Sequence, residues 1–206
     1  GDWSGPGGAR IVLRQQDVDL GILETARGGL LRRGLAVIKA DAALITNVAE
    51  DHLGDFGSQN LGELLNVKWI VSRAVETSGS LILNADDELL VAKSAEFSGV
   101  IVWFTLNPDN PTVKEHARNG GLAFVLDGDS LLRVDGDSIE EICKSTEIPI
   151  VLDGVASHNI ANALAAAALT HCLGIPMSDI HEGLTSMSQD NNPGRSNVYS
   201  ISDFKV

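Results

Sequence analysis

Several short motifs that identify well-known enzyme classes are missing from this sequence. It contains no GxxxxGK[ST] phosphate loop, no GxGxxG dinucleotide motif, no GxSxG nucleophile turn and no HExxH zinc motif. Its two cysteines, Cys143 and Cys172, are far apart and form no CxxC pair, so we expect small buried thiols rather than a disulfide or a metal site. Any function must therefore be carried by other residues.

Positive charge and long apolar runs are also scarce. The chain has 15 Lys and Arg residues against 28 Asp and Glu residues, and its formal net charge is −13. Nucleic-acid binding depends on clustered Lys and Arg, so we expect no nucleic-acid partner. No apolar run approaches the roughly 18 residues that a membrane span needs, and the first residues form no signal segment. With 44% hydrophobic and 21% charged residues, the composition predicts a globular, cytoplasmic protein without a membrane partner.

Apolar runs alternate with helical patterns from about residue 11 to residue 105, which is typical of a parallel sheet covered by helices. The expected strands are 9–15, 18–25, 41–48, 79–86 and 99–105. One helix is expected over 60–79, with Gly79 as its C-terminal cap, and another over 86–99, with Asp86 or Asp87 at its N-cap.

The pattern changes after residue 107. Residues 122–134 read as a hairpin around the turn 127–130, and 148–154 could add a further strand. An alanine-rich helix is expected from a Ser157 N-cap to a Gly174 C-cap, followed by a shorter helix with Pro176 near its start. The predicted fold class is α/β: a mostly parallel sheet flanked by helices, with a small antiparallel β extension.

Polar residues gather where three of the expected strands end. The clusters are Glu24–Gly29, Thr46–Gly54, which contains Asp51 and His52, and Asn84–Asp87. Ligands of open parallel sheets collect at the carboxyl ends of the strands, so these clusters are expected to lie near one another. Carboxylate and amide oxygens with one imidazole suit Mg²⁺ and phosphate groups.

Each of these residues also has a purely structural explanation. Glu24 could cap a helix or pair with Arg27, and His52 could be a hydrogen-bonded surface residue. Lys68 could be a surface lysine whose stem lies along its helix.

The same choice applies to the second half of the chain. His158, Asn159 and Asn162 open the alanine-rich helix, where they could hydrogen-bond a planar heterocycle or simply belong to a good helix former. Arg195 either binds phosphate from the domain edge or is a charge in a linker.

Taken together, these stretches resemble the central, ATP-binding domain of the Mur ligase family over nearly the whole chain. The resemblance rests on TNVAEDHLG (46–54), Lys68, NADD (84–87), SHNIANALAAA (157–167) and PGR (193–195), in this order and at these separations. The start of the chain, with ETARGGLLRRGL at 24–35, is most similar to the ligase module of the cyanophycin synthetases. The resemblance implies a P-loop NTPase-like fold and an ATP- and Mg²⁺-dependent ligase that joins a carboxylate to an amino acid through an acyl phosphate.

The resemblance also implies roles for single residues. Glu24 and His52 match the metal ligands, Lys68 matches a lysine that many members carbamylate, and Arg195 matches the linker arginine near the phosphates. The expected nucleotide-binding residues are Asn84, His158, Asn159 and Asn162, and the expected substrate-binding residues are Thr25, Arg27, Gly28 and Gly29. The spacer between His52 and Lys68 is slightly longer than in the peptidoglycan ligases, which leaves carbamylation of Lys68 open.

The resemblance further predicts that residues 1–190 form a central domain that lacks its phosphate-loop segment, and that 191–206 are a linker and the start of a C-terminal ligase domain. We therefore expect this chain alone neither to bind ATP tightly nor to ligate a substrate. The expected partners are a small-molecule or polymer carboxylate and an amino acid, with self-association possible. The alternatives are a peptidoglycan-precursor or folylpolyglutamate-type ligase, and a non-catalytic nucleotide-binding module.

Overall fold

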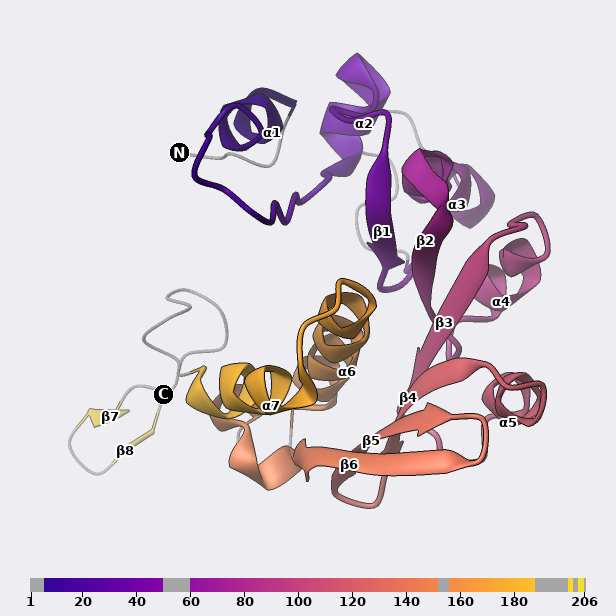
Figure 1. The fold of residues 1–206 in the computed structure, drawn as a ribbon, viewed down its shortest axis with the longest axis vertical. Helices are drawn as coiled ribbons and strands as arrows, with labels where there is room; N and C mark the ends of the chain where they lie inside the picture. The colour runs from indigo at the N-terminus through magenta and orange to yellow at the C-terminus, as the bar shows by residue number, and fades with distance from the viewer. Residues whose placement is uncertain (1–5, 50–59, 152–155, 188–199, 202–203, 206) are drawn as a thin grey trace. The chain divides into compact units, whose positions relative to one another are not determined.

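The computed structural model of the protein describes residues 6–49, 60–151, 156–187, 200–201 and 204–205. The chain divides into two compact units, Gly1–Ile101 and Val102–Val206, and each is described by itself. The first unit contains α1 (Pro6–Val12), α2 (Arg27–Arg33), β1 (Ala40–Ile45), α3 (Leu61–Trp69), the 3-10 helix η2 (Ile70–Ala74), β2 (Val75–Asn84) and α4 (Glu88–Ser94) (Figure 1).

The second unit begins at Val102, within β3 (Val100–Thr105). Its elements are α5 (Pro111–Arg118), β4 (Leu122–Asp127), β5 (Ser130–Asp135), β6 (Ser138–Lys144), the 3-10 turns η3 (Ser145–Glu147) and η4 (Pro149–Val151), α6 (Ser157–Cys172), α7 (Met177–Ser186), and the short strands β7 (Ser200–Ile201) and β8 (Phe204–Lys205). In this unit α5 and α6 lie on opposite sides of β4, and both pack against it (Figure 1).

The strand pairings confirm the predicted fold class. β1 pairs with β2 and β3 pairs with β4 in parallel, whereas β4–β5 and β5–β6 are antiparallel. The six strands make a mostly parallel sheet with two antiparallel strands, flanked by helices. β7 and β8 form a separate two-stranded pair.

The predicted strands at 9–15 and 18–25 are wrong. Residues 6–12 form helix α1, in which Pro6 occupies the first position, where a fixed φ and a missing N–H are tolerated. Residues 18–25 form no strand, and Val18, Leu20 and Ile22 are 41%, 44% and 67% exposed. An apolar run is suited to burial, but it becomes a strand only when a neighbouring strand accepts its backbone hydrogen bonds.

The helix predicted over 60–79 is shorter in the structure. It begins after Asn60, whose side chain accepts from the N–H of Glu63 at 2.9 Å, and it ends at Trp69, with η2 following. Gly79 is therefore not a helix cap. It is a buried residue of β2, at the point where the β1–β2 register jumps from Ala40↔Val75 to Ala42↔Ser80.

In the second unit, the hairpin predicted around residues 127–130 is confirmed: β4 ends at Asp127, β5 begins at Ser130, and Gly128 adopts a φ of 61° in the turn. The strand that extends this hairpin is β6, however, and residues 148–151 of the stretch predicted as a strand form none, since Pro149 begins the turn η4; residues 152–154 lie outside the described residues. Proline lacks the N–H that a strand ladder requires, which explains the difference.

The two predicted C-terminal helices are confirmed, with one correction at a cap. Ser157 is the first residue of α6 rather than its N-cap, and the N-cap residue Ala156 makes no side-chain capping bond. At the other end, Gly174 has a φ of 80°, and the N–H groups of Gly174 and Ile175 bond to the carbonyls of His171 and Thr170. This pattern is a Schellman motif, which Gly allows because it lacks a Cβ. Pro176 is the N-cap of α7.

Each unit has its own apolar core. In the first unit the fully buried side chains come from α3, β2 and α4, and they include Leu64, Leu81, Ile82, Leu83 and Leu90. In the second unit they include Phe104, Phe124, Leu131 and Leu164. Among the helices that the structure describes, none is long and apolar enough to cross a membrane.

Candidate functional site

The segment that follows β1 is held by side chains from three other places in the first unit. We call residues 46–49 the β1 loop. The amide nitrogen Nδ2 of Asn84 donates to the carbonyl of Thr46 at 3.0 Å, and Nζ of Lys68 donates to the carbonyl of Asn47 at 2.7 Å. The N–H of Val48 donates to Oδ2 of Asp87 at 2.6 Å. Each of the three consecutive residues Thr46, Asn47 and Val48 thus has one main-chain group held by a side chain. In the sequence, these residues precede the segment that contains Asp51 and His52.

The strand register explains why Asn84 reaches the β1 loop. Ile45, the last residue of β1, pairs with Leu83 of β2, so Thr46, the next residue along, lies beside Asn84, the last residue of β2. Both ends of the Asn84 amide are engaged by main-chain groups, because its Oδ1 accepts from the N–H of Asp86 at 2.9 Å. Asn84 therefore orders both the β1 loop and the turn after β2. Its predicted contact with a nucleotide stays a prediction.

Lys68 lies in the last turn of α3, and its side chain is half-buried. Besides the Asn47 carbonyl, its Nζ lies 3.5 Å from Oδ1 of Asn47. Two oxygen acceptors next to Nζ suit a protonated amine, which can donate three hydrogen bonds. Lys68 thus connects the helix α3 to the β1 loop, and its carbamylation stays a prediction.

The predicted metal and substrate residues at 24–29 precede and open helix α2. Glu24 and Thr25 are exposed, and α2 begins at Arg27 after the N-cap Ala26, whose backbone is extended. Arg27, Gly28 and Gly29 are half-buried. Helix α2 packs against α3, the helix that carries Lys68. The structure therefore packs α2, which opens with Arg27, Gly28 and Gly29, against the helix whose Lys68 holds the β1 loop.

The predicted nucleotide residues of α6 belong to the second unit. His158 and Asn162 are both exposed and are four positions apart, so they share one helix face. Asn159 differs, because it is half-buried and its Nδ2 donates to the carbonyl of Ile150 at 2.5 Å. Asn159 thus ties the start of α6 to the turn η4. That these residues lie near Glu24, as expected from the sequence, stays a prediction.

His52 and Arg195 lie outside the residues that the structure describes, as does Asp51. Within the described ranges, no group of three or more His, Cys, Asp or Glu side chains is close enough together to hold a metal ion. The donor chemistry of the predicted set nevertheless fits Mg²⁺, since Glu24 offers an exposed carboxylate, a hard oxygen ligand.

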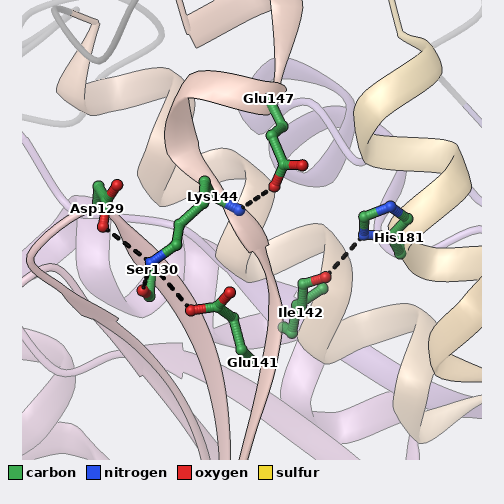
Figure 2. A network of polar contacts seen from close by, with 7 residues as sticks. All are labelled: Asp129, Ser130, Glu141, Ile142, Lys144, Glu147 and His181. Carbon is green, nitrogen blue, oxygen red and sulfur yellow. Dashed lines mark hydrogen bonds and ion pairs between the residues drawn. The ribbon is translucent and has the colours of Figure 1, made fainter.

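A second polar network lies in the other unit, around Lys144 on β6 (Figure 2). Nζ of Lys144 contacts Oδ1 of Asp129 and Oε2 of Glu141, both at 3.1 Å, and Oγ of Ser130 at 2.5 Å. Hydrogen bonds to the two carboxylates raise the pKa of Lys144, and hydrogen bonds from Ser130 and Lys144 lower the pKa of Glu141. These carboxylates are exposed. The ion pair to Asp129 joins β6 to the turn between β4 and β5, the pair to Glu141 lies within β6, and the hydrogen bond to Ser130 joins β6 to β5. The network therefore reads as support for the hairpin rather than as a binding site.

Sequence reasoning missed the role of Asp87 at the β1 loop. It predicted Asp86 or Asp87 as the helix cap, and the structure has Asp87 there, because Oδ1 of Asp87 accepts from the N–H groups of Leu89 and Leu90 at 3.0 and 3.2 Å. The bond to Val48 spans 39 positions and depends on the strand register. The only sequence feature that could have indicated this second role is the pair of adjacent carboxylates in the NADD stretch.

Comparison with known proteins places these observations in a family. The Mur ligase middle domain profile matches residues 10–170. A cyanophycin synthetase of Crocosphaera subtropica is 35% identical over 206 residues, covering 99% of this chain and 24% of that protein. A UDP-N-acetylmuramoyl-tripeptide–D-alanyl-D-alanine ligase of Haemophilus influenzae is 30% identical over 153 residues, covering 74% of this chain and 30% of that protein.

A solved structure shows the same fold. A crystal structure of MurF from Acinetobacter baumannii has a TM-score of 0.66 at 19% identity, covering all of this chain and 42% of that one. The chain spans about a quarter of the length of the cyanophycin synthetases that it matches, 24% in the case given above. Because the family profile covers most of the chain, the chain belongs to the Mur ligase middle domain family.

Proposed function

We propose that this chain is the central, nucleotide-binding part of an ATP-dependent ligase that joins a carboxylate to an amine, and that the whole protein acts like a cyanophycin synthetase. One observation carries the choice of subfamily: similarity to the cyanophycin synthetase of Crocosphaera subtropica extends over 99% of the chain, whereas similarity to the UDP-N-acetylmuramoyl-tripeptide–D-alanyl-D-alanine ligase of Haemophilus influenzae extends over 74%. In this proposal residues 1–190 are the central domain, and residues 191–206 lead into a further domain.

The proposed reaction has two steps. A substrate carboxylate attacks the γ-phosphate of ATP, which releases ADP and forms an acyl phosphate. The amine of the incoming amino acid then attacks the acyl carbon, phosphate leaves, and an amide bond results. Such phosphoryl transfer needs positioning and charge neutralisation more than covalent help from the protein.

This chain's residues are assigned to the reaction as follows. Glu24 and His52 hold Mg²⁺, which when bound neutralises phosphate oxygens. Thr25, Arg27, Gly28 and Gly29 contact the substrate near the acyl phosphate, and Lys68 and Arg195 act at the reacting phosphates. Asn84, His158, Asn159 and Asn162 contact the nucleotide.

The described contacts support part of this assignment and refine it. Lys68 and Asn84 both bind carbonyl groups of the β1 loop, so each fixes residues that directly precede the predicted metal segment in the sequence. The packing of α2 on α3 brings Arg27, Gly28 and Gly29 near the same helix. Asn159 is engaged with the Ile150 carbonyl, which leaves the exposed His158 and Asn162 as the better nucleotide contacts.

A substrate comparison tests the proposal. ADP release by the full-length protein is measured with arginine and a polyaspartate acceptor, and separately with a UDP-linked muramyl acid and an amino acid. We expect ADP release, with amide formation detected by mass spectrometry, in the first mixture. Turnover only in the second would favour a peptidoglycan-precursor ligase, which the similarity to the Haemophilus influenzae enzyme makes the second candidate. Nucleotide binding without turnover in either mixture would favour a non-catalytic module.

A further inference from the structure

Exposed apolar side chains are concentrated in the part of the chain that precedes β1. Of the ten large hydrophobic residues that are exposed in the described ranges, seven lie between Ile11 and Ile38. Single exposed apolar residues are common on protein surfaces, but a concentration of them marks a surface that other polypeptide covers. This part of the chain therefore has an apolar face that is open to a partner.

Within it, residues 18–24, which we call the 18–24 segment, have the side-chain pattern of a strand. Val18, Leu20 and Ile22 are 41%, 44% and 67% exposed, and Asp19 and Gly21 stand between them. In an extended chain every second side chain points to the same side, so the three apolar residues would share one face. This alternation is typical of a half-buried strand, although the segment forms no strand in the structure.

The sheet of the first unit offers a place for such a strand beside β1. Among the strands that the structure describes, β1 has a neighbour, β2, on one side only, so its other side is an edge of the sheet. The middle of β1, residues 42–44, is only half-buried, whereas Leu81, Ile82 and Leu83 of β2 are fully buried. Because an edge strand presents main-chain N–H and C=O groups that can pair with a further strand, the free edge of β1 can accept one.

The connection between the two elements also fits. Residues 25–39 link the 18–24 segment to β1 and contain α2. Two neighbouring parallel strands need a connection of about a dozen residues or more, usually with a helix in it. Helix α2 already packs against α3, so the helix of such a connection is in place, and only the residues before it have to move.

We propose that the 18–24 segment docks on the free edge of β1 as a parallel strand, with Val18, Leu20 and Ile22 on a face that becomes covered. The chain covers 24% of the Crocosphaera subtropica protein, so a protein of that length has further chain to cover the docked segment. Docking places Glu24 and Thr25 at the edge of the sheet where the β1 loop begins, because the carboxyl ends of parallel strands meet there. The inference goes beyond the proposed function and does not depend on ligase activity.

Hydrogen exchange of the full-length protein tests the docking. We expect amides of residues 18–24 to exchange on the order of a hundredfold more slowly than in a free peptide of the same sequence. Ile22→Lys places a charge on the face that becomes covered, so residues 18–24 should lose this protection while β2 keeps its own. Ile38→Lys is the matched control, because Ile38 is 89% exposed and lies outside the docked segment, and this variant should match the wild type.

A disulfide test locates the docked segment. The register that aligns Glu24 with Thr46 puts Gly21 beside Ala43, and neighbouring strands lie about 4.7–4.9 Å apart, within the range of Cα separations of about 4.4–6.8 Å that a disulfide spans. Oxidation of the variant Gly21→Cys with Ala43→Cys should therefore link these two positions, as mass spectrometry of the linked peptides can show. Leu13→Cys with Ala43→Cys is the control pair and should not link.

Each outcome decides the matter. Slow exchange of residues 18–24, its loss in Ile22→Lys and the link to position 43 within one chain together support the docking. Wild-type exchange as fast as in the free peptide, or protection that Ile22→Lys leaves unchanged, would overturn it. A link that forms only between two copies would mean that a second copy occupies the edge, which also overturns it. If Ile22→Lys does not fold, the wild-type exchange and the disulfide still decide, and failure of the ligase assay leaves these results untouched.

Discussion

Replacement of Gly79 by alanine should destabilise the first unit through a backbone clash. Gly79 is buried in β2, where the register to β1 is irregular and the backbones of the two strands approach closely. A Cβ on this residue would lie 2.5 Å from the carbonyl oxygen of Asp41, 3.0 Å from Cγ1 of Val75 and 3.1 Å from the carbonyl carbon of Asp41. Favourable contacts between carbon atoms lie at about 3.5–4.0 Å, so the strands must separate or the side chain must distort.

The expected cost follows from the identity of the clashing atoms. A flexible side chain could rotate away, but the nearest atoms belong to the main chain of a paired strand, which cannot move without disturbing the ladder. One extra methyl group in a tightly packed interior typically costs about 1–3 kcal/mol, and we expect Gly79→Ala to fall in the upper half of that range. The gain of about 0.5–1 kcal/mol from a less flexible unfolded chain offsets only part of this cost.

Gly183→Ala provides a control with the opposite expected sign. Gly183 is exposed inside α7, and a Cβ there would meet nothing within 4 Å. Alanine in a helix interior is favoured over glycine by about 0.8–1.0 kcal/mol, so this variant should be slightly more stable than the wild type. Urea unfolding followed by circular dichroism gives the free energies, and hydrogen exchange of β1 and β2 peptides assigns the loss to the first unit. If Gly79→Ala were as stable as the wild type, with β1 and β2 equally protected, the inferred close approach of the strands would be wrong.

Three further predictions concern the second unit. Burial raises the pKa of Cys143 to about 11, so at pH 8 only about 0.1% of its thiol is ionised, and labelling by iodoacetamide should be slow until urea is added, as mass spectrometry can show. Burial, aided by the positive charge of Arg133, lowers the pKa of His171. The stability that its neutral form contributes is fully present above the ordinary pKa of about 6.5 and is lost as the pH falls through the pKa of the folded state. The free energy of unfolding of His171→Gln, measured in urea at several pH values, should therefore depend less on acid over that range than that of the wild type. His181 contacts the carbonyl of Ile142 through Nδ1 at 2.8 Å, and His181→Ala should lower the free energy of unfolding by about 0.5–1.5 kcal/mol in urea titrations, whereas no change would mean that this bond adds nothing to the docking of α7 on β6.

Local signals in the sequence were sufficient for much of this fold. Asp87 caps α4 and Gly174 closes α6 because capping depends only on residues within one turn of the helix end. The hairpin at 127–130 was predictable for the same reason. Continuous apolar runs likewise identified β2 and β3, although β2 begins at Val75, four residues before the predicted strand.

Features that depend on distant partners were not predictable in the same way. The run at 18–25 has the composition of a buried strand, yet in the structure Ile22 is 67% exposed, because composition does not specify a pairing partner. Gly79 looked like a helix cap because glycine commonly ends helices, but here it allows close approach of a neighbouring strand. For the candidate site, the sequence indicated the NADD stretch without showing what it would touch.

The residue types in that stretch follow from the hydrogen bonds that the strand register imposes. At position 84 one side chain must donate to the carbonyl of Thr46 and also accept from the N–H of Asp86, which an amide can do and a carboxylate cannot. At position 87 one side chain must accept from Val48 and from two N–H groups of α4, which a carboxylate can do and an amide cannot. Exchanging the two residue types would therefore place acceptor against acceptor at Thr46 and donor against donor at either Val48 or the helix start. The order of Asn and Asp in the stretch is thus explained by its support of the β1 loop, before any contact with a nucleotide is invoked.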